Sequence, residues 1–345
     1  MATQNSRLIL HAPNVHIGGG FELLRSLLEA GTQIFVYAQL DQRVRSQISW
    51  PSTAPVNWVR WTIWARLGAE WRLRRRCCEA DTVLCFHGLP PLFAVRGRVV
   101  VFVQNRILFE SEKLKGYPCL TRLRLSCERM WVRVRGASGC RYVVQTPSME
   151  AAVRRCLGPA AKITVQAFAG PMGPLPQRPS PTGPSIDFVY VASGDAHKNH
   201  LCLLEAWRLL SEAALRPSLV LTVNSKSYGP LADMIAQYTE RYALNIVNIG
   251  QVDRARIQSL YQSSSALIFP SVLESFGLPL IEATQVGLPI LAPELDYVRD
   301  VVEPVQTFDP ASPFSIARAV KRFLGNPEPV VHVGTAEEFL TEVCR

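Results

Sequence analysis

Two patterns of hydrophobic positions alternate along the chain. Short runs of apolar, mostly β-branched residues are followed by longer stretches in which apolar residues recur every three or four positions. The short runs are typical of buried strands and the longer stretches of amphipathic helices, so their alternation predicts parallel sheets covered by helices, an α/β fold class. The predicted strands are 8–11, 34–37, 83–86, 99–103, 142–144 and 163–168 in the first half, and 188–192, 219–223, 246–249, 266–269 and 290–292 in the second.

A proline-rich segment separates the two halves. Six prolines lie between Gly170 and Ser185, a density that neither a helix nor a central strand accommodates. The length of 345 residues also suits two domains. We therefore expect two Rossmann-like domains that face each other across a cleft. The expected division is an N-terminal domain at 1–168, a linker at 169–186, a C-terminal domain at 187–325 and a C-terminal segment at 326–345. This last segment is a candidate for packing back on the N-terminal domain.

The composition excludes several classes of protein. With 48% hydrophobic and 19% charged residues, the chain is expected to fold into a globular protein with a sizeable core. No apolar run approaches the roughly 18 residues that a membrane-spanning helix needs, and the first residues lack the layout of a signal peptide, so we expect a cytoplasmic protein. The nine cysteines contain no Cys-x-x-Cys pair, which favours reduced thiols over a disulfide framework or a metal site.

Positive charge is concentrated in the first half. Residues 1–150 hold 21 Lys and Arg against 10 Asp and Glu, whereas the rest of the chain holds 16 against 18. Such an asymmetry predicts an anionic partner for the first half, either a membrane surface, a phosphorylated substrate or nucleic acid. Neither a helix-turn-helix pattern nor the aromatic pattern of an RNA-binding sheet occurs, so we do not expect nucleic acid.

Two basic stretches of this half are amphipathic. Residues 58–76 place four tryptophans among arginines, the composition of a helix that lies on anionic lipid, and we expect that role for them over burial in the domain. Residues 120–135 carry one apolar stripe, and here we favour an ordinary helix that buries the stripe in the domain over a membrane helix. The tryptophans are Trp58, Trp61, Trp64 and Trp71, and the stripe consists of Leu120, Leu123, Cys127, Met130 and Val134.

Two strand-to-helix turns could bind phosphate. Gly18, Gly19 and Gly20 follow the first predicted strand, and backbone N–H groups without a neighbouring Cβ can approach a phosphate at a helix N-terminus. The pattern matches neither Gly-x-Gly-x-x-Gly nor the P-loop, so a plain tight turn is the alternative. In the second half, Ser193–Asn199 follows a predicted strand and places Lys198 at the edge of the sheet, where a lysine can neutralise a diphosphate or simply be solvated.

The most specific motif is Pro-Ser-Val-Leu-Glu-Ser-Phe-Gly-Leu-Pro-Leu-Ile-Glu-Ala at residues 270–283. It follows a predicted strand, and Pro279 suits the first turn of a helix. We expect Glu282 in that first turn, leaning back toward Glu274, so that two carboxylates and free N–H groups converge on one spot. Amides around Gly277 can bind phosphate, and a carboxylate can accept two hydrogen bonds from a vicinal diol such as a ribose.

This motif resembles that of the family-four retaining glycosyltransferases of the bacterial surface-polysaccharide type, which have the GT-B fold. Gly18–Gly20, Ser193–Asn199 and Leu291–Val302 agree with the family in the expected order. The resemblance implies that the first domain binds the acceptor and the second the nucleotide sugar. It further implies that Glu274 meets the donor sugar, Lys198 holds the diphosphate, and both act in catalysis, while Glu282 holds the ribose hydroxyls. The other implied substrate contacts are Gly18, Gly19, Gly20, Ser193, Gly194, Asn199, Ser275, Phe276, Gly277 and Leu278.

Two positions depart from the family pattern. Members often carry an arginine a few residues before the lysine, where this chain has Gly194 and Asp195, so one phosphate contact is missing or comes from elsewhere. The first-domain strand that often ends in His-Asp leads here into Gln-Asn-Arg. An amide can hydrogen-bond a sugar hydroxyl but cannot act as an acid or base near neutral pH. From this tripeptide we expect Asn105 and Arg106 to contact substrate.

The resemblance implies a retaining transfer of a sugar from a nucleotide diphosphate sugar to a saccharide acceptor, with a lipid-linked oligosaccharide of O-antigen, lipopolysaccharide or capsule synthesis as the expected acceptor. The chain contains no Asp-x-Asp, the pair that holds a divalent cation in metal-dependent glycosyltransferases, so we expect no metal and no cofactor beside the donor. The expected place is the inner leaflet of the cytoplasmic membrane. Two alternatives stay open, a sugar-nucleotide 2-epimerase of the same fold and a non-catalytic membrane-binding protein.

Overall fold

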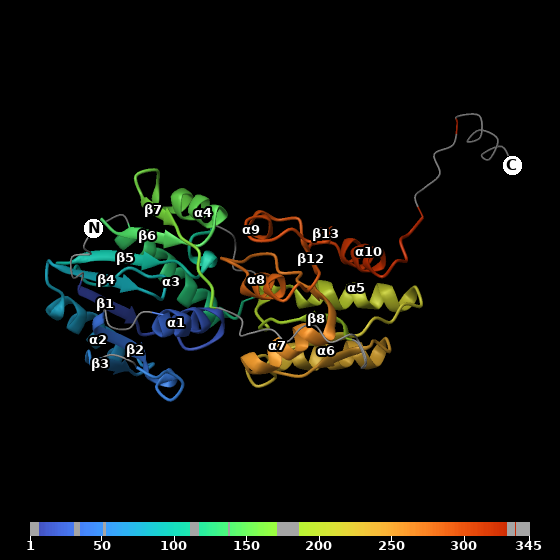
Figure 1. Ribbon diagram of the computed structural model, residues 1–345, viewed down its shortest axis with the longest axis horizontal. Coiled ribbons are helices and arrows are strands. Elements are labelled where there is room, and N and C mark those ends of the chain that lie inside the picture. Colours follow the sequence, from blue (N-terminus) through green and yellow to red (C-terminus); the bar gives the residue numbers. More distant parts are fainter. Residues whose placement is uncertain are drawn as a thin grey trace.

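The protein consists of two α/β domains that lie side by side (Figure 1). The structure, a computed structural model, describes residues 7–30, 35–50, 53–110, 117–136, 139–170, 186–329 and 335. In each domain a parallel sheet is covered by helices, which confirms the expected fold class. Most of the expected linker and most of the C-terminal segment lie outside the described residues, so the expected domain limits stay predictions.

The first domain is built on a parallel sheet with the strand order β3-β2-β1-β4-β5-β6-β7. Buried apolar clusters lie around this sheet, one centred on Val83 and Tyr142 and the other on Leu24 and Phe86. The strands are β1 (Arg7–Ala12), β2 (Phe35–Asp41), β3 (Val56–Val59), β4 (Asp81–Cys85), β5 (Arg98–Phe102), β6 (Arg141–Val144) and β7 (Lys162–Val165), and the helices are α1 (Gly18–Ala30), α2 (Ile63–Arg76), α3 (Cys119–Gly136) and α4 (Pro147–Leu157).

The second domain repeats this topology with the strand order β10-β9-β8-β11-β12-β13. One buried cluster, which includes Trp207, Tyr190 and Phe269, joins the sheet to its helices. The strands are β8 (Ile186–Tyr190), β9 (Leu219–Leu221), β10 (Ile246–Asn248), β11 (Ser264–Ile268), β12 (Ile290–Pro293) and β13 (Gln306–Phe308), and the helices are α5 (His200–Glu212), α6 (Gly229–Arg241), α7 (Arg254–Ser263), α8 (Leu278–Gln285), α9 (Asp296–Arg299) and α10 (Pro313–Phe323).

The hydrophobic pattern missed two strands, β3 and β13, which are edge strands of the two sheets. Both are short, and most of their residues are only partly buried. An edge strand pairs on one side alone and needs no continuous apolar run, so its pattern does not stand out from that of a loop.

The expectation for residues 120–135 was wrong. Helix α3 buries Leu125 and Val132 against the domain, whereas the predicted stripe faces solvent, with Leu120 83% exposed. The tryptophan segment agrees better with its expectation, since Trp61, Trp64 and Trp71 are exposed, although Trp58 packs against the core. Among the described residues, no helix is long and apolar enough to cross a membrane.

Candidate functional site

Polar contacts join the two domains along the edges where their strands end. They connect side chains or backbone groups that lie far apart in the sequence, and they bring the predicted site residues of both domains together. The contacts are Ser275 with Gln104, Tyr117 with His197, Ser148 with Asp300, and Arg254 with Glu22.

Lys198 lies at the edge of the sheet as expected, and there it meets Glu274, a contact that was not predicted. Lys198 ends the short 3-10 helix η3 (Ala196–Lys198) after β8, and Glu274 follows β11, the neighbouring strand at the point where the strand order reverses. The ammonium group of Lys198 donates to Oε1 of Glu274 at 2.6 Å, and the two side chains are only 16% and 11% exposed. Tyr190 donates to the carbonyl oxygen of Lys198 at 2.8 Å and so fixes this turn. A bound diphosphate would offer Lys198 a second anionic partner in a poorly solvated place.

The turn before Lys198 leaves no room for an arginine at position 194. A Cβ atom at Gly194 would lie only 2.5 Å from Cγ of Tyr228, so the ring of Tyr228 leaves no room for a side chain there. Ser193 donates to the Asp195 carboxylate at 2.7 Å. Asn199 adopts a left-handed conformation and donates to two carbonyl oxygens, those of Pro270 at 3.1 Å and of a further proline, residue 310, at 2.7 Å. The Asn199 side chain thus holds the turn against the loop after β11.

The three glycines belong to the first turn of α1 and not to a loop before it, because α1 begins at Gly18. Gly18 has a φ of 68°, which favours glycine. A Cβ on Gly19 would lie 2.8 Å from Cδ1 of Leu278, and one on Gly20 would overlap Oε1 of Gln104. The absence of side chains therefore lets the N-terminus of α1, with its free N–H groups, lie directly against the second domain.

The motif at 270–283 forms the other side of this junction. Ser275 donates to the carbonyl oxygen of Gln104 at 2.8 Å, Phe276 is buried, and Leu278 packs against the core of the first domain. Gly277, with a φ of 71°, is the N-cap of α8. The N-termini of α1 and α8 thus meet, and both carry the partial positive charge that favours an anion.

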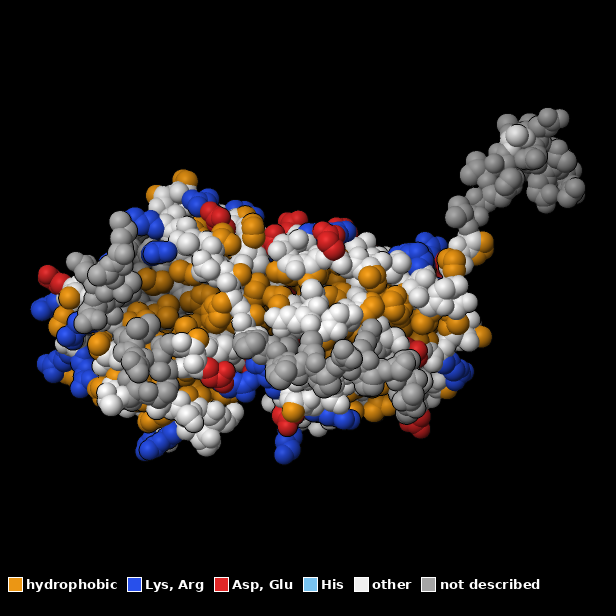
Figure 2. All heavy atoms as spheres, viewed as in Figure 1, with side chains coloured by type: hydrophobic (Ala, Val, Ile, Leu, Met, Phe, Trp, Pro, Cys, Tyr) orange, Lys and Arg blue, Asp and Glu red, His pale blue; other side chains and the backbone are white. Residues whose placement is uncertain are grey.

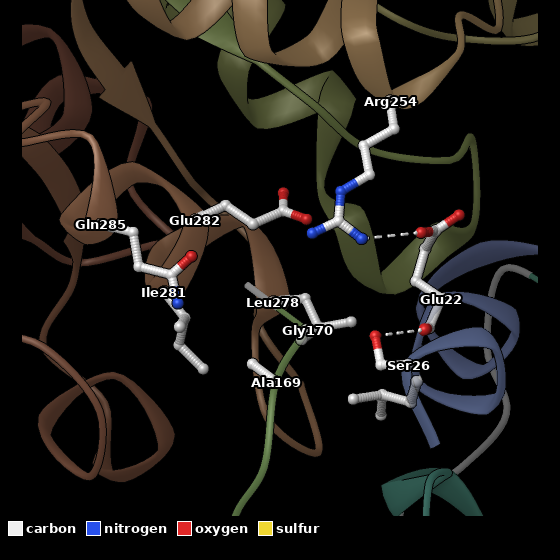
Figure 3. A pocket seen from close by; sticks show the side chains of 10 residues that line it. Glu22, Ser26, Ala169, Gly170, Arg254, Leu278, Ile281, Glu282 and Gln285 are labelled. Carbon is white, nitrogen blue, oxygen red and sulfur yellow. Dashed lines mark hydrogen bonds and ion pairs between the residues drawn. The ribbon is translucent and has the colours of Figure 1, made fainter. Parts of the chain in front are cut away.

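The expected meeting of Glu274 and Glu282 is wrong. Helix α8 begins at Leu278, so Glu282 lies in its second turn, not its first. Its Oε2 accepts a hydrogen bond from Tyr261 at 3.0 Å, and its carboxylate faces Arg254 in a pocket between the domains (Figure 3). Glu274 instead faces Lys198. The two carboxylates therefore have different neighbours.

The tripeptide after β5 places Gln104, which was not predicted, at the junction of the domains. The Asn105 side chain accepts from the N–H of Ile107 at 3.1 Å and caps a 3-10 helix, and Arg106 donates to Glu110 at 2.9 Å. Gln104 is the residue that reaches the junction, and its buried Nε2 has no hydrogen-bond partner among the described residues. A buried amide without a partner is costly, so it marks a place where a ligand hydroxyl can bind. The sequence pattern indicated this tripeptide but not that Gln104 lies at the junction, and the expected contacts of Asn105 and Arg106 with substrate stay predictions.

Tyr117, just before α3, was not predicted. Its hydroxyl lies 2.7 Å from Nδ1 of His197, and the two rings stack. Burial, aided by the charges of Asp195 and Glu274, raises the pKa of Tyr117 to about 12, and burial lowers the pKa of His197. Both groups are therefore uncharged near neutral pH, and Tyr117 extends a first-domain ring toward the Lys198 turn. No motif in the sequence indicated it.

A buried histidine cluster lies at the ends of β1 and β4, and it too was missed. His11 bonds Gln39 Oε1 through Nδ1 at 2.7 Å and Glu70 Oε1 through Nε2 at 3.0 Å. His11, Glu70 and His87 offer ligand atoms within 4.8 Å of one another, a set that could hold a metal. Burial lowers the pKa of His87 to about 3. Both His11 nitrogens have partners in the chain, and the contact with Glu70 ties α2 to the sheet.

Comparisons with known proteins agree with this architecture. Residues 176–337 match the family described as glycosyl transferases group 1. Over 117 residues the chain is 31% identical to O-antigen chain mannosyltransferase B of Escherichia coli, which covers 33% of this chain and 30% of that protein. It is 29% identical over 117 residues to D-rhamnosyltransferase WbpZ of Pseudomonas aeruginosa, covering 32% and 31%. The chain thus spans about a third of the length of these curated relatives.

Solved structures extend the likeness to both domains. HepE of Anabaena, solved in complex with UDP and glucose, has a TM-score of 0.66 at 13% identity, with 92% of this chain and 90% of that chain covered. Sucrose-phosphate synthase of Thermosynechococcus elongatus has a TM-score of 0.70 at 15% identity, with 93% and 90% covered. At such low identity the likeness shows a common fold. The chain therefore has the GT-B fold, and its residues 176–337 are similar to the group 1 glycosyl transferases.

Proposed function

We propose that the protein transfers a sugar, with retention and without a metal, from a nucleotide diphosphate sugar to a saccharide acceptor. The observation that carries the proposal is the Lys198–Glu274 pair, which lies beside the meeting N-termini of α1 and α8. A lysine and two helix N-termini form a site for a diphosphate. The structural neighbour HepE binds UDP and glucose, which supports a nucleotide sugar as the donor class.

The chemistry follows from where charge develops. As the glycosidic C–O bond breaks, the sugar gains oxocarbenium character and negative charge builds on the leaving diphosphate. Lys198 and the helix N-termini stabilise that charge, and Glu274 lies where it can stabilise the sugar. The acceptor hydroxyl attacks from the face that the phosphate leaves, and its proton passes to the leaving phosphate oxygen. Gln104, through its unpartnered amide, donates a hydrogen bond to a hydroxyl of the donor sugar.

The acceptor that we propose is a lipid-linked saccharide of bacterial surface-polysaccharide synthesis. One relative acts in that setting by name, O-antigen chain mannosyltransferase B of Escherichia coli. A lipid-linked acceptor presents its sugar at a membrane surface, so the enzyme gains by binding there. This part of the proposal makes the anionic inner leaflet a partner of the first domain.

An exposed surface of the first domain supports that partner. We call it the Trp/Arg surface and define it by exposed apolar side chains in and beside α2 and α3, with exposed arginines among them. The charge of Arg66 on α2 acts on Glu128 of α3, so the two helices are near neighbours. Blue side chains gather at the outer end of this domain, where α2 lies (Figure 2). The apolar members are Trp61, Ile63, Trp64, Trp71, Leu120, Leu123, Met130 and Val134, and the arginines are Arg60, Arg72, Arg74, Arg75, Arg122, Arg124 and Arg133.

The enzymatic part is tested with a panel of UDP, GDP and dTDP sugars, with and without saccharide acceptors. We expect acceptor-dependent release of nucleotide and a glycoside with the anomeric configuration of the donor. Glu274→Gln should chiefly lower kcat, and Glu282→Gln should chiefly weaken nucleotide binding, because the ribose is held alike in ground and transition states. Release of an epimerised free sugar without any acceptor would favour the 2-epimerase instead.

The membrane part is tested by sedimentation with vesicles. Each arginine near an anionic surface contributes about 1 kcal/mol, so we expect the protein to pellet with anionic vesicles at low salt and much less with neutral ones. Trp61→Glu with Trp64→Glu should abolish pelleting, while the matched control Val305→Glu with Phe314→Glu, two exposed apolar residues of the second domain, should not. Equal binding of all three proteins would contradict this role of the surface.

A further inference from the structure

A charged side chain bridges the two domains beside the pocket of Glu282. Arg254 is the first residue of α7, and its Nη1 lies 3.2 Å from Oε2 of Glu22 on α1. Figure 3 shows its guanidinium group between the carboxylates of Glu22 and Glu282. The three side chains come from three helices and both domains. Arg254 is therefore placed to respond to both carboxylates at once.

Opposing charges act on Glu282 in this place. Burial raises the pKa of its carboxyl, while the hydrogen bond from Tyr261 and the positive charge of Arg254 oppose that shift. The negative charge of Glu22 adds to the rise. Glu22 itself is held by Arg25 at 2.6 Å in addition to Arg254. The charged and titratable groups that face Glu282 are thus Tyr261 and Arg254 from α7 and Glu22 from α1.

We propose that Arg254 and Glu22 are positioning residues that set the charge of Glu282 and thereby its affinity for the ribose diol of the donor nucleotide. The proposal rests on the proposed function, in which Glu282 holds that ribose. An ionised carboxylate accepts hydrogen bonds from both hydroxyls of a vicinal diol, whereas a protonated one must donate one hydrogen itself. Arg254 favours the ionised form, and Glu22 disfavours it.

The arrangement also links the ribose site to the meeting of the domains. Glu22 belongs to the first domain, and its distance from Arg254 changes if the domains move apart. At the same place a Cβ on Gly170 would overlap Ser26 of α1 and lie 3.5 Å from Arg254 Nη1. Gly170 is therefore closely packed between the two domains. Glu282, the proposed ribose ligand, therefore has both Arg254 and Glu22 as neighbours only when the two domains contact each other here.

The test measures nucleotide affinity, so it needs neither the donor sugar nor the acceptor. UDP and GDP, each beside its 2′-deoxy analogue, are titrated by calorimetry between about pH 5 and pH 8 into the wild type, Arg254→Gln and Glu22→Gln. The matched controls are Arg256→Gln, an exposed arginine of the same helix α7, and Glu29→Gln, an exposed glutamate of α1. Each control makes the same change of charge on the same helix without facing Glu282.

The two variants should shift the pH dependence in opposite directions. Ribose binding needs the ionised carboxylate, so wild-type affinity falls as the pH drops through the raised pKa of Glu282. Arg254→Gln removes a positive neighbour and should move that fall to higher pH, whereas Glu22→Gln removes a negative neighbour and should move it to lower pH, each by about one pH unit. The controls should superimpose on the wild type.

The other outcomes overturn the proposal or its foundation. Both variants break the same ion pair, so if the bridge were merely structural they would weaken binding alike, without opposite shifts, and the proposal would be wrong. Glu282→Gln tests the foundation separately, since it should bind a nucleotide and its 2′-deoxy analogue equally. If Glu282→Gln still prefers the ribose form, or if the wild type binds none of these nucleotides, the assignment of the ribose site fails together with the proposal.

Discussion

Replacing Lys198 by methionine removes its charge and keeps most of its bulk. In the structure Lys198 has two foreseeable roles, to compensate the buried carboxylate of Glu274 and to bind the diphosphate of the donor. Methionine retains the aliphatic stem and makes no ion pair. The substitution therefore leaves Glu274, with only 11% of its side chain exposed, without its cation.

The magnitudes of the two effects can be worked from this burial. Removing one partner of a fully buried ion pair costs about 3–5 kcal/mol, and the remaining exposure of this pair places the expected loss of unfolding free energy at the low end, about 3 kcal/mol. Loss of one strong contact to transition-state charge lowers kcat by about 10² to 10³. The double variant Lys198→Met with Glu274→Gln carries no unpaired charge, so it should regain more than half of the lost stability and none of the lost turnover.

Urea unfolding, followed by far-UV circular dichroism, measures the stability of the wild type, the single variant and the double variant, and initial rates with the active donor measure turnover. Because stability and turnover respond differently to the double variant, a simple folding defect is separated from a loss of catalysis. Near wild-type turnover of Lys198→Met would refute the diphosphate role. A double variant as unstable as the single one would refute the argument from the buried pair.

Three further predictions concern other parts of the molecule. Gln104→Leu should raise the KM of the nucleotide sugar several-fold with little change in the affinity for free nucleotide, and equal effects on both ligands would exclude Gln104 as a sugar contact. Glu70→Gln should lower the unfolding free energy by about 3 kcal/mol at pH 7, because it breaks the buried contact with His11. Burial opposes ionisation of Glu70, but the charge of His11 and the hydrogen bond with it lower the pKa of Glu70 overall. The wild type should therefore lose this stability as the pH falls below the ordinary glutamate pKa of about 4.3. In pH-dependent denaturation the variant should lose less unfolding free energy over the same acid range. EDTA should leave transfer unchanged if Lys198 and the helix N-termini carry the diphosphate, and full dependence on Mg²⁺ or Mn²⁺ would contradict that mechanism.

Local sequence determined the elements and the place of two candidate site residues. Patterns with a period of two predict strands and patterns with a period of three to four predict helices, because side-chain direction repeats with the backbone. Each of the eleven expected strands overlaps an observed strand and differs from it only at its ends. Lys198 and Glu274 could each be expected at the carboxyl edge of the second sheet, because each follows a strand of a parallel sheet, but their contact with each other was not predicted. Gly277 and Pro279 likewise determine the start of α8 through backbone conformation alone.

The tertiary structure decided which side chains face which neighbour. The apolar stripe of α3 is exposed because the domain covers its other face, and Gln104 reaches the junction because α1 and the motif of the second domain close around it. Arg254 meets Glu22 across 232 positions of sequence. Which neighbour a side chain faces depends on packing free energies between segments far apart in the chain, and local periodicity does not contain them. The sequence by itself therefore determined the elements and the motif, whereas the contacts between domains decided what each side chain faces.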